Sequence, residues 1–178
     1  MGYTAVLGIP YAAAPFGDRR FREPQPAEAW SGVRHCAAFG PIAPQSAELP
    51  GAPVWRPGDE DILTVNVWVP ERAEGGVLPV LFWIHGGAYT FGSSAQPDFD
   101  GTALARAGLV VVSCNFRAGF EGFGHYRGIG SQDVLIAAAR PYYLLSRYNP
   151  DLMDLRITHA NASPRTPAEP QVSAPHIT

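Results

Sequence analysis

The stretch PVLFWIHGGAYTFGS, residues Pro79–Ser93, decides the fold, because a long apolar run ends there in two adjacent glycines. Pro79–His85 is apolar along its length, which is typical of a strand that is covered on both faces of a sheet. Adjacent glycines permit a tight turn with positive φ and let another group come close to the main chain. The stretch therefore predicts a buried strand followed by a turn that something approaches.

The flanking segments predict two more strands and a helix. Ile62–Val69, ILTVNVWV, is rich in β-branched and aromatic residues and favours a strand. Thr102–Ala107 favours a short helix closed by Gly108, and Leu109–Asn115 is again apolar throughout. A strand, a helix and a strand at this spacing predict a crossover unit in a mostly parallel α/β sheet.

The rest of the chain is less regular. Residues 7–60 are rich in proline, glycine and isolated aromatics, which predicts a segment that wraps over a surface. Three regions follow from the sequence: 1–125 as the N-terminal part of one domain, 126–156 as a divergent and partly helical segment, and 157–178 as a tail. The tail is rich in alanine, proline, serine and threonine without periodicity, which predicts disorder.

Composition excludes several classes of function. The net charge is −3 and the 13 basic residues are scattered, so nothing favours nucleic acid or an anionic membrane as a partner. Two cysteines are too few for a disulfide framework or a four-ligand zinc site. No apolar stretch approaches the ~20 residues that cross a bilayer, and no signal peptide opens the chain. We expect a cytoplasmic protein without a cofactor, a metal or a membrane partner.

Several blocks in a fixed order carry a family resemblance. They include GIPYAAAPFGDRRFREPQPAEAWSGV, EDILTVNVWVP, LPVLFWIHGGAYTFGS and DGTALARAGLVVVSCNFRAGFEGFGH, and together they span residues 7–125. This order resembles the type-B carboxylesterase family, the cholinesterase-like branch of the α/β-hydrolases. The resemblance implies the N-terminal part of an α/β-hydrolase fold, and hydrolysis of small-molecule carboxylic esters through an acyl-enzyme.

The resemblance assigns a catalytic role to the glycine turn. Ester hydrolysis places negative charge on the carbonyl oxygen in the transition state, and backbone N–H groups of an oxyanion hole stabilise that charge. In this family a segment of the HGGG type supplies such donors. By resemblance the donors are the N–H groups of Gly87 and Ala88, with Gly86 shaping the turn. Ala88 stands where many members have glycine, so it must find an allowed φ.

Other positions are expected to be structural. By resemblance, Arg20 and Glu60 form a buried salt bridge, and removing one partner of such a bridge costs ~3–5 kcal/mol. His85 has no mark of a catalytic base, and we expect a packed, hydrogen-bonded side chain. Asn115, Phe116 and Arg117 match the family's NYR motif, with phenylalanine in place of tyrosine.

The nucleophile, acid and base of the family are absent from the chain. None of the nine serines lies in a G-x-S-x-G motif, and His125, His159 and His176 have no family context. Three hypotheses remain open. The chain is an inactive N-terminal fragment of a serine carboxylesterase, or half of a split hydrolase whose second polypeptide supplies the triad, or a non-catalytic cholinesterase-like interaction module.

Overall fold

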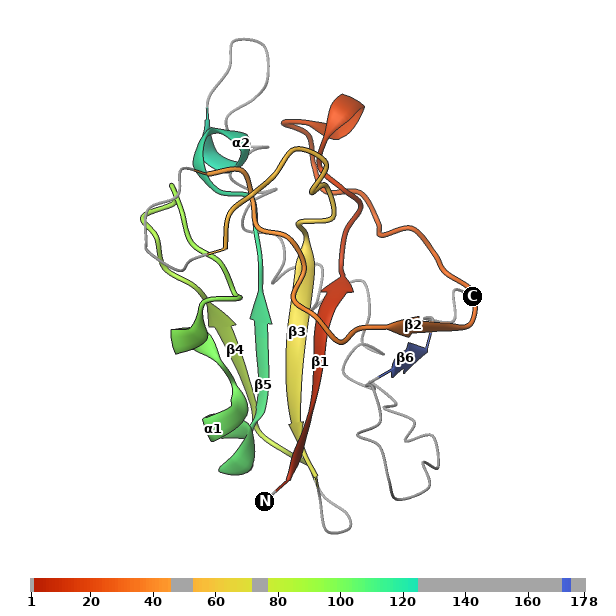
Figure 1. Ribbon diagram of the computed structural model, residues 1–178, viewed down its shortest axis with the longest axis vertical. Coiled ribbons are helices and arrows are strands. Elements are labelled where there is room, and N and C mark those ends of the chain that lie inside the picture. Colours follow the sequence, from red (N-terminus) through yellow and green to blue (C-terminus); the bar gives the residue numbers. More distant parts are fainter. Residues whose placement is uncertain (1, 46–52, 72–76, 125–170, 174–178) are drawn as a thin grey trace.

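A four-stranded sheet forms the centre of the molecule, in a computed structural model that describes residues 2–45, 53–71, 77–124 and 171–173. The strands lie in the order β1-β3-β5-β4 (Figure 1). Their bounds are Tyr3–Pro10 for β1, Thr64–Pro70 for β3, Val110–Cys114 for β5 and Val80–Ile84 for β4. No helix in the described ranges is long and apolar enough to cross a membrane.

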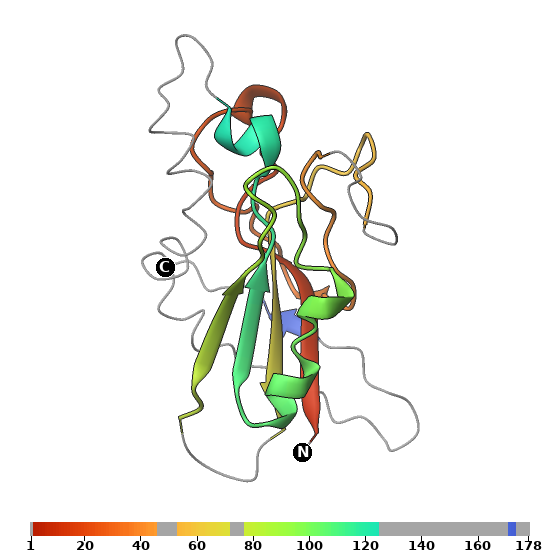
Figure 2. The same cartoon turned by 90° about the vertical axis from the view of Figure 1, so that its left-hand side faces the viewer.

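The predicted crossover unit is confirmed. β4 and β5 pair in parallel, from Val80 beside Val110 to Ile84 beside Cys114. The connection between them contains η2 (Pro97–Phe99) and α1 (Thr102–Arg106). Figure 2 shows α1 on one face of the sheet. This arrangement brings the carboxyl ends of β4 and β5 to the same edge of the sheet, where α/β folds usually place their binding sites.

The sheet is mixed, because β3 runs antiparallel to both β1 and β5. Strand β1 was not expected from the sequence, because a register shift between Val6 and Ile9 breaks its alternation of inward and outward side chains. Gly8 lies in this irregularity with a φ of 73°. Its N–H donates to Oδ1 of Asn66 on β3 at 2.9 Å, which closes the gap in the backbone ladder.

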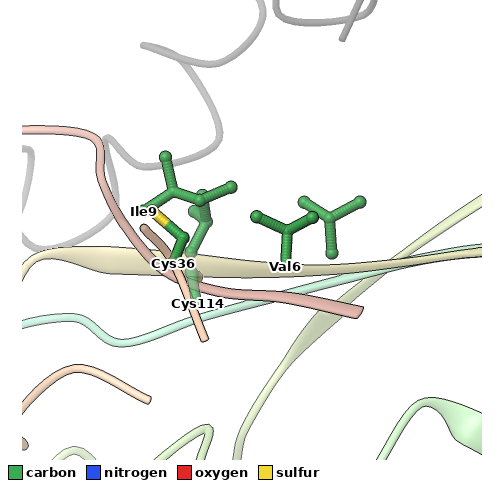
Figure 3. Close-up of a cluster of buried hydrophobic side chains, with 6 residues drawn as sticks. Val6, Ile9, Cys36 and Cys114 are labelled. Atoms are coloured by element: carbon green, nitrogen blue, oxygen red, sulfur yellow. The ribbon is translucent and has the colours of Figure 1, made fainter. Parts of the chain in front are cut away.

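Two clusters of apolar side chains cover the two faces of the sheet. On one face Val6, Ile9, Cys36 and Cys114 belong to one buried cluster, in which Figure 3 shows Ile9 beside the two cysteines. On the face that carries α1, Trp68 packs with Ala105 and Val111 and is only 2% exposed. Consecutive residues of β1 and of β3 belong alternately to the two clusters, because successive side chains of a strand point to opposite faces of the sheet.

Burial of the two cysteines predicts slow thiol chemistry. Burial raises the pKa of the Cys114 thiol to about 12, from 9.0. Since the thiolate is the reactive form, Cys114 in a Cys36→Ser variant should react with iodoacetamide at pH 9 at least ~100-fold more slowly in the folded chain than in urea. The measurement is mass-spectrometric labelling over time. Equal rates in buffer and urea would contradict the packing shown in Figure 3.

β4 is more exposed than the sequence predicts. Val80, Trp83 and Ile84 are 46%, 42% and 56% exposed. The prediction of a strand covered on both faces is therefore wrong for the described residues, because β4 is the outermost strand of their sheet. The apolar run of β4 fits an interior strand of a larger sheet.

The remaining elements are short. They are η1 (Gly17–Arg19), β2 (Val33–His35), α2 (Gly119–Phe123) and β6 (Gln171–Ser173). β2 and β6 pair antiparallel, which departs from the disorder predicted for 157–178 at these three residues. The predicted segment 126–156 and the rest of the tail lie outside the described residues.

Candidate functional site

The candidate site is the turn that follows β4, residues 86–92, which we call the glycine turn. It lies at the carboxyl end of β4, beside the segment that leads from β5 into α2 (Figure 1). The N–H of Gly119, the first residue of α2, donates to the carbonyl of Tyr89 at 2.6 Å. This bond ties the turn to the start of α2.

Gly87 has a conformation that only glycine adopts without strain. Its φ is 132°, and a Cβ at this position would overlap the carbonyl oxygen of Phe91. The carbonyl of Gly87 accepts the N–H groups of Thr90 at 2.9 Å and Phe91 at 3.1 Å. The turn is therefore folded tightly back on Gly87, and the glycine is a geometric requirement.

Ala88 finds an allowed conformation at the position where a third glycine is common. Its φ is 50°, and Tyr89 after it has a φ of 66°, so both lie in the left-handed region. Non-glycine residues enter this region at a cost of roughly 1–2 kcal/mol each. The hydrogen bonds that the turn makes with Gly119 and Gln45 must offset this cost.

The turn leaves two backbone donors unused. Within the described ranges, the N–H groups of Gly87 and Ala88 donate to no protein acceptor. Ala88 is exposed and Gly87 is half-buried, so both donors are near solvent. The residues predicted as the donors thus lie side by side with their N–H groups available to an incoming oxygen.

Gln45 fixes the far end of the glycine turn. Its Oε1 accepts the N–H of Gly92 at 2.6 Å, and its Nε2 donates to the carbonyl of Gly92 at 2.9 Å. Nε2 also donates to the carbonyl of Ala43 at 3.1 Å. One side-chain amide therefore pairs with both the N–H and the carbonyl of Gly92, in the way that the backbone of a neighbouring strand pairs with a residue. The sequence did not indicate this role, because a glutamine in a loop carries no local signal of a partner 47 positions away.

His85 packs beneath the turn, and the expected structural role is confirmed. Its side chain is 4% exposed and stacks on Phe116, with ring centroids 4.2 Å apart. Nδ1–H donates to the carbonyl of Gly86 at 2.9 Å. Burial lowers the pKa of His85, so the ring is held neutral. The phenylalanine that replaces the motif's tyrosine supplies the stacking surface.

A buried polar network holds the chain just after the turn. Asn66 donates to Oγ of Ser94 at 3.0 Å and of Ser113 at 3.1 Å. Ser94 donates its N–H and its hydroxyl to Oδ1 of Asn115, at 2.8 and 2.9 Å. The serine's hydrogen bonds are thus used in linking β3, β5 and the turn. Ser94 is therefore a structural residue.

The predicted salt bridge between Arg20 and Glu60 is wrong. Nε of Arg20 donates to both carboxylate oxygens of Glu121 on α2, at 2.9 and 2.8 Å, and Nη2 donates to Oε1. The side chain of Arg20 is 52% exposed, and Glu60 is exposed as well. The segment around Arg20 is therefore attached to α2 and not to β3, because Glu121 on α2 lies against the guanidinium.

These features define what the site can do chemically. Two adjacent backbone donors can bind an oxygen that gains negative charge. No group of three or more possible metal ligands occurs among the described residues. The described part of the chain thus presents two adjacent backbone N–H groups that have no acceptor among the described residues.

Comparison with known proteins places these observations in a family. The model of the Carboxylesterase family matches residues 2–133. Phenmedipham hydrolase from Pseudarthrobacter oxydans is 44% identical over 139 residues, covering 75% of this chain and 28% of that protein. Para-nitrobenzyl esterase from Bacillus subtilis is 42% identical over 121 residues, covering 66% of this chain and 24% of that protein.

A solved carboxylesterase structure is also similar to this chain. The crystal structure of the Geobacillus stearothermophilus carboxylesterase EST55 at pH 6.8 matches with a TM-score of 0.66 and 39% identity. The match covers 80% of this chain and 30% of that structure. The chain thus spans about a quarter of the length of these two curated relatives, within the N-terminal part of an α/β-hydrolase fold. The chain belongs to the carboxylesterase family.

Proposed function

We propose that this chain supplies the oxyanion-hole element of a serine carboxylesterase that acts on small carboxylic esters. The observation that carries the proposal is the pair of unused donors at Gly87 and Ala88, held by a turn that is anchored at Gln45 and Gly119. Removing one such donor from an oxyanion hole lowers kcat by about 10²–10³-fold. The nucleophile, acid and base come from outside the 178 residues, so the chain alone is inactive.

We infer that the hydrolase is split between two polypeptides, and the exposure of β4 supports this inference. The apolar strand β4 is the outermost described strand, and it exposes Val80, Trp83 and Ile84. Such a surface is covered when a sheet is extended by further strands. A second polypeptide that extends the sheet would cover these side chains and bring its catalytic serine to the glycine turn.

Reassembly with a relative tests the proposal. The chain is purified alone, and also co-expressed with the part of Bacillus subtilis para-nitrobenzyl esterase that it does not match. We expect no hydrolysis of p-nitrophenyl acetate above the buffer rate for the chain alone, because no triad is present. We expect the co-expressed pair to hydrolyse the ester with burst kinetics, because an acyl-enzyme accumulates.

Two results would contradict the proposal. Turnover by the chain alone would show a catalytic group within the 178 residues. A soluble, tightly associated pair without turnover would show that the glycine turn does not serve as the oxyanion hole. In an active pair, Gly87→Ala should lower kcat, because it opens the turn that holds both donors.

A further inference from the structure

The small second sheet joins segments from opposite ends of the chain. β2 pairs antiparallel with β6, so that Val33 lies opposite Ser173 and His35 lies opposite Gln171. These two strands form a sheet of their own. Figure 1 shows them beside β1, on the opposite side of the main sheet from β4. The pair therefore lies away from the edge at which further strands would extend the main sheet.

The side chains of β2 bury little surface. Val33 is 52% exposed and His35 is exposed as well. Arg34 between them is half-buried, with its guanidinium carbon 5.6 Å from the centre of the Trp30 ring. A ribbon of two short strands without an apolar face to bury is marginal in water. The order of β2 therefore depends on its backbone pairing with β6.

The end of β2 continues into the core of the main sheet. Cys36 follows β2 directly and is 3% exposed, in the cluster that also holds Ile9 and Cys114. The carbonyl of Cys36 accepts the N–H of Leu7 at 2.8 Å, and Leu7 also forms a bridge with Ala37. Loosening of β2 would thus reach Cys36 first. Cys114 lies on β5, which has a paired strand on each side.

The sequence around β6 favours an extended segment. The three residues of β6 lie between Pro170 and Pro175 in the chain. A proline disfavours helix at its own position and at the residue before it, so extended backbone is the preferred state of this short stretch. Such a stretch loses less conformational entropy when it binds than a freely flexible peptide does. Addition of a strand to an exposed edge then gains its affinity from backbone hydrogen bonds.

We propose that the edge of β2 is a strand-acceptor site whose ligand is the segment 171–173 of the same chain, and that the bound segment keeps Cys36 covered. When β6 leaves, β2 loosens and the Cys36 thiol becomes accessible, while the four-stranded sheet stays intact. Because ligand and site belong to one chain, their effective concentration does not depend on the protein concentration. This inference depends neither on ester hydrolysis nor on a second polypeptide.

The first test measures the alkylation of both thiols by iodoacetamide in the full chain, with peptide mapping by mass spectrometry. Val172→Pro combined with Ser173→Pro removes a backbone donor toward β2 whichever pair carries it, because hydrogen-bonded pairs alternate along an antiparallel ladder. We expect Cys36 to react at least about tenfold faster in this variant, since local opening exposes it. Cys114 should stay within about twofold of its rate in the parent chain.

The control is a pair of prolines elsewhere in the C-terminal part of the chain. Ala162→Pro combined with Ser163→Pro leaves the sequence of β6 unchanged and should leave both alkylation rates as in the parent. Equal acceleration of Cys36 and Cys114 in the β6 variant would show that its effect is not local to β2. An unchanged rate at Cys36 would show that β6 does not cover this thiol. Either result would overturn the proposal.

The second test fixes the register and the source of the strand, and it keeps β6 free of proline. Val33→Cys and Ser173→Cys are introduced into a chain that carries Cys36→Ala and Cys114→Ala, and glutathione disulfide serves as the oxidant. We expect a cross-link within one chain, formed at least about tenfold faster than with Val33→Cys and Val172→Cys, because consecutive residues of a strand point to opposite faces. Equal rates for the two pairs would overturn the proposal. A cross-link formed mainly between two chains would also overturn it, by assigning the strand to a second copy.

Discussion

Replacing Gly87 by alanine should lower the free energy of unfolding of the chain by more than about 2 kcal/mol. Two effects add. A φ of 132° lies outside the range of side-chain-bearing residues, and the new methyl group would overlap the carbonyl oxygen of Phe91. The turn would have to open, which breaks the bonds that the Gly87 carbonyl accepts from Thr90 and Phe91. Urea denaturation monitored by tryptophan fluorescence measures the change.

The neighbouring glycine supplies the control. A Cβ on Gly86 would meet nothing within 4 Å. Gly86→Ala should therefore change the unfolding free energy by no more than about 0.5 kcal/mol, as an exposed substitution does. Equal effects of the two substitutions would mean that the tight turn at Gly87 does not form in solution.

The second large effect is expected at the centre of the sheet. Trp68→Ala should destabilise the chain by about 3–5 kcal/mol, because it removes a buried indole and leaves a cavity. Trp68 is 2% exposed, packs with Ala105 and Val111, and lies where a Cβ on Gly101 would touch its ring. Since a whole domain has only ~5–15 kcal/mol of stability, most of the cooperative unfolding transition should be lost. Circular dichroism during thermal unfolding measures this.

Trp83 provides the matched control within the same sheet. Its side chain is 42% exposed on β4 and its ring lies 5.6 Å from that of Phe99. Trp83→Ala should therefore cost about 1 kcal/mol or less in the isolated chain. A cost as large as that of Trp68→Ala would show that β4 is covered in solution, against the exposure described above.

The regular part of the fold could be predicted from the sequence because its signals are local. The apolar runs of β3, β4 and β5 and the helix between β4 and β5 each lie within a short window. β1 could not be recognised, since the irregularity at Gly8 breaks its alternation and its stability depends on pairing with Val65 and Val67, more than 50 residues away. The exposure of β4 depends on which strands lie beside it, and a single strand's sequence does not carry that information.

In the candidate site, too, some features could be predicted from a local motif and others depended on contacts that are distant in sequence. The glycine turn has a compact motif, so Gly86, Gly87 and Ala88 could be singled out in advance. The partners of long polar side chains could not. Arg20 selects Glu121 across 101 residues, and the amide of Gln45 reaches Gly92 across 47. Both choices depend on three-dimensional proximity, which charge and spacing alone do not determine.

The strand order also has a consequence for synthesis. All four strands of the sheet come from the first 114 residues, and β5, the third strand from the β1 edge, is the last to be made. Because chains emerge from the ribosome N-terminus first and fold by units, this sheet can form before any later segment exists. The β1 side is partly occupied by the bridge between Leu7 and Ala37. A strand that joined the sheet after these four would therefore add beyond β4, without separating a pair already made.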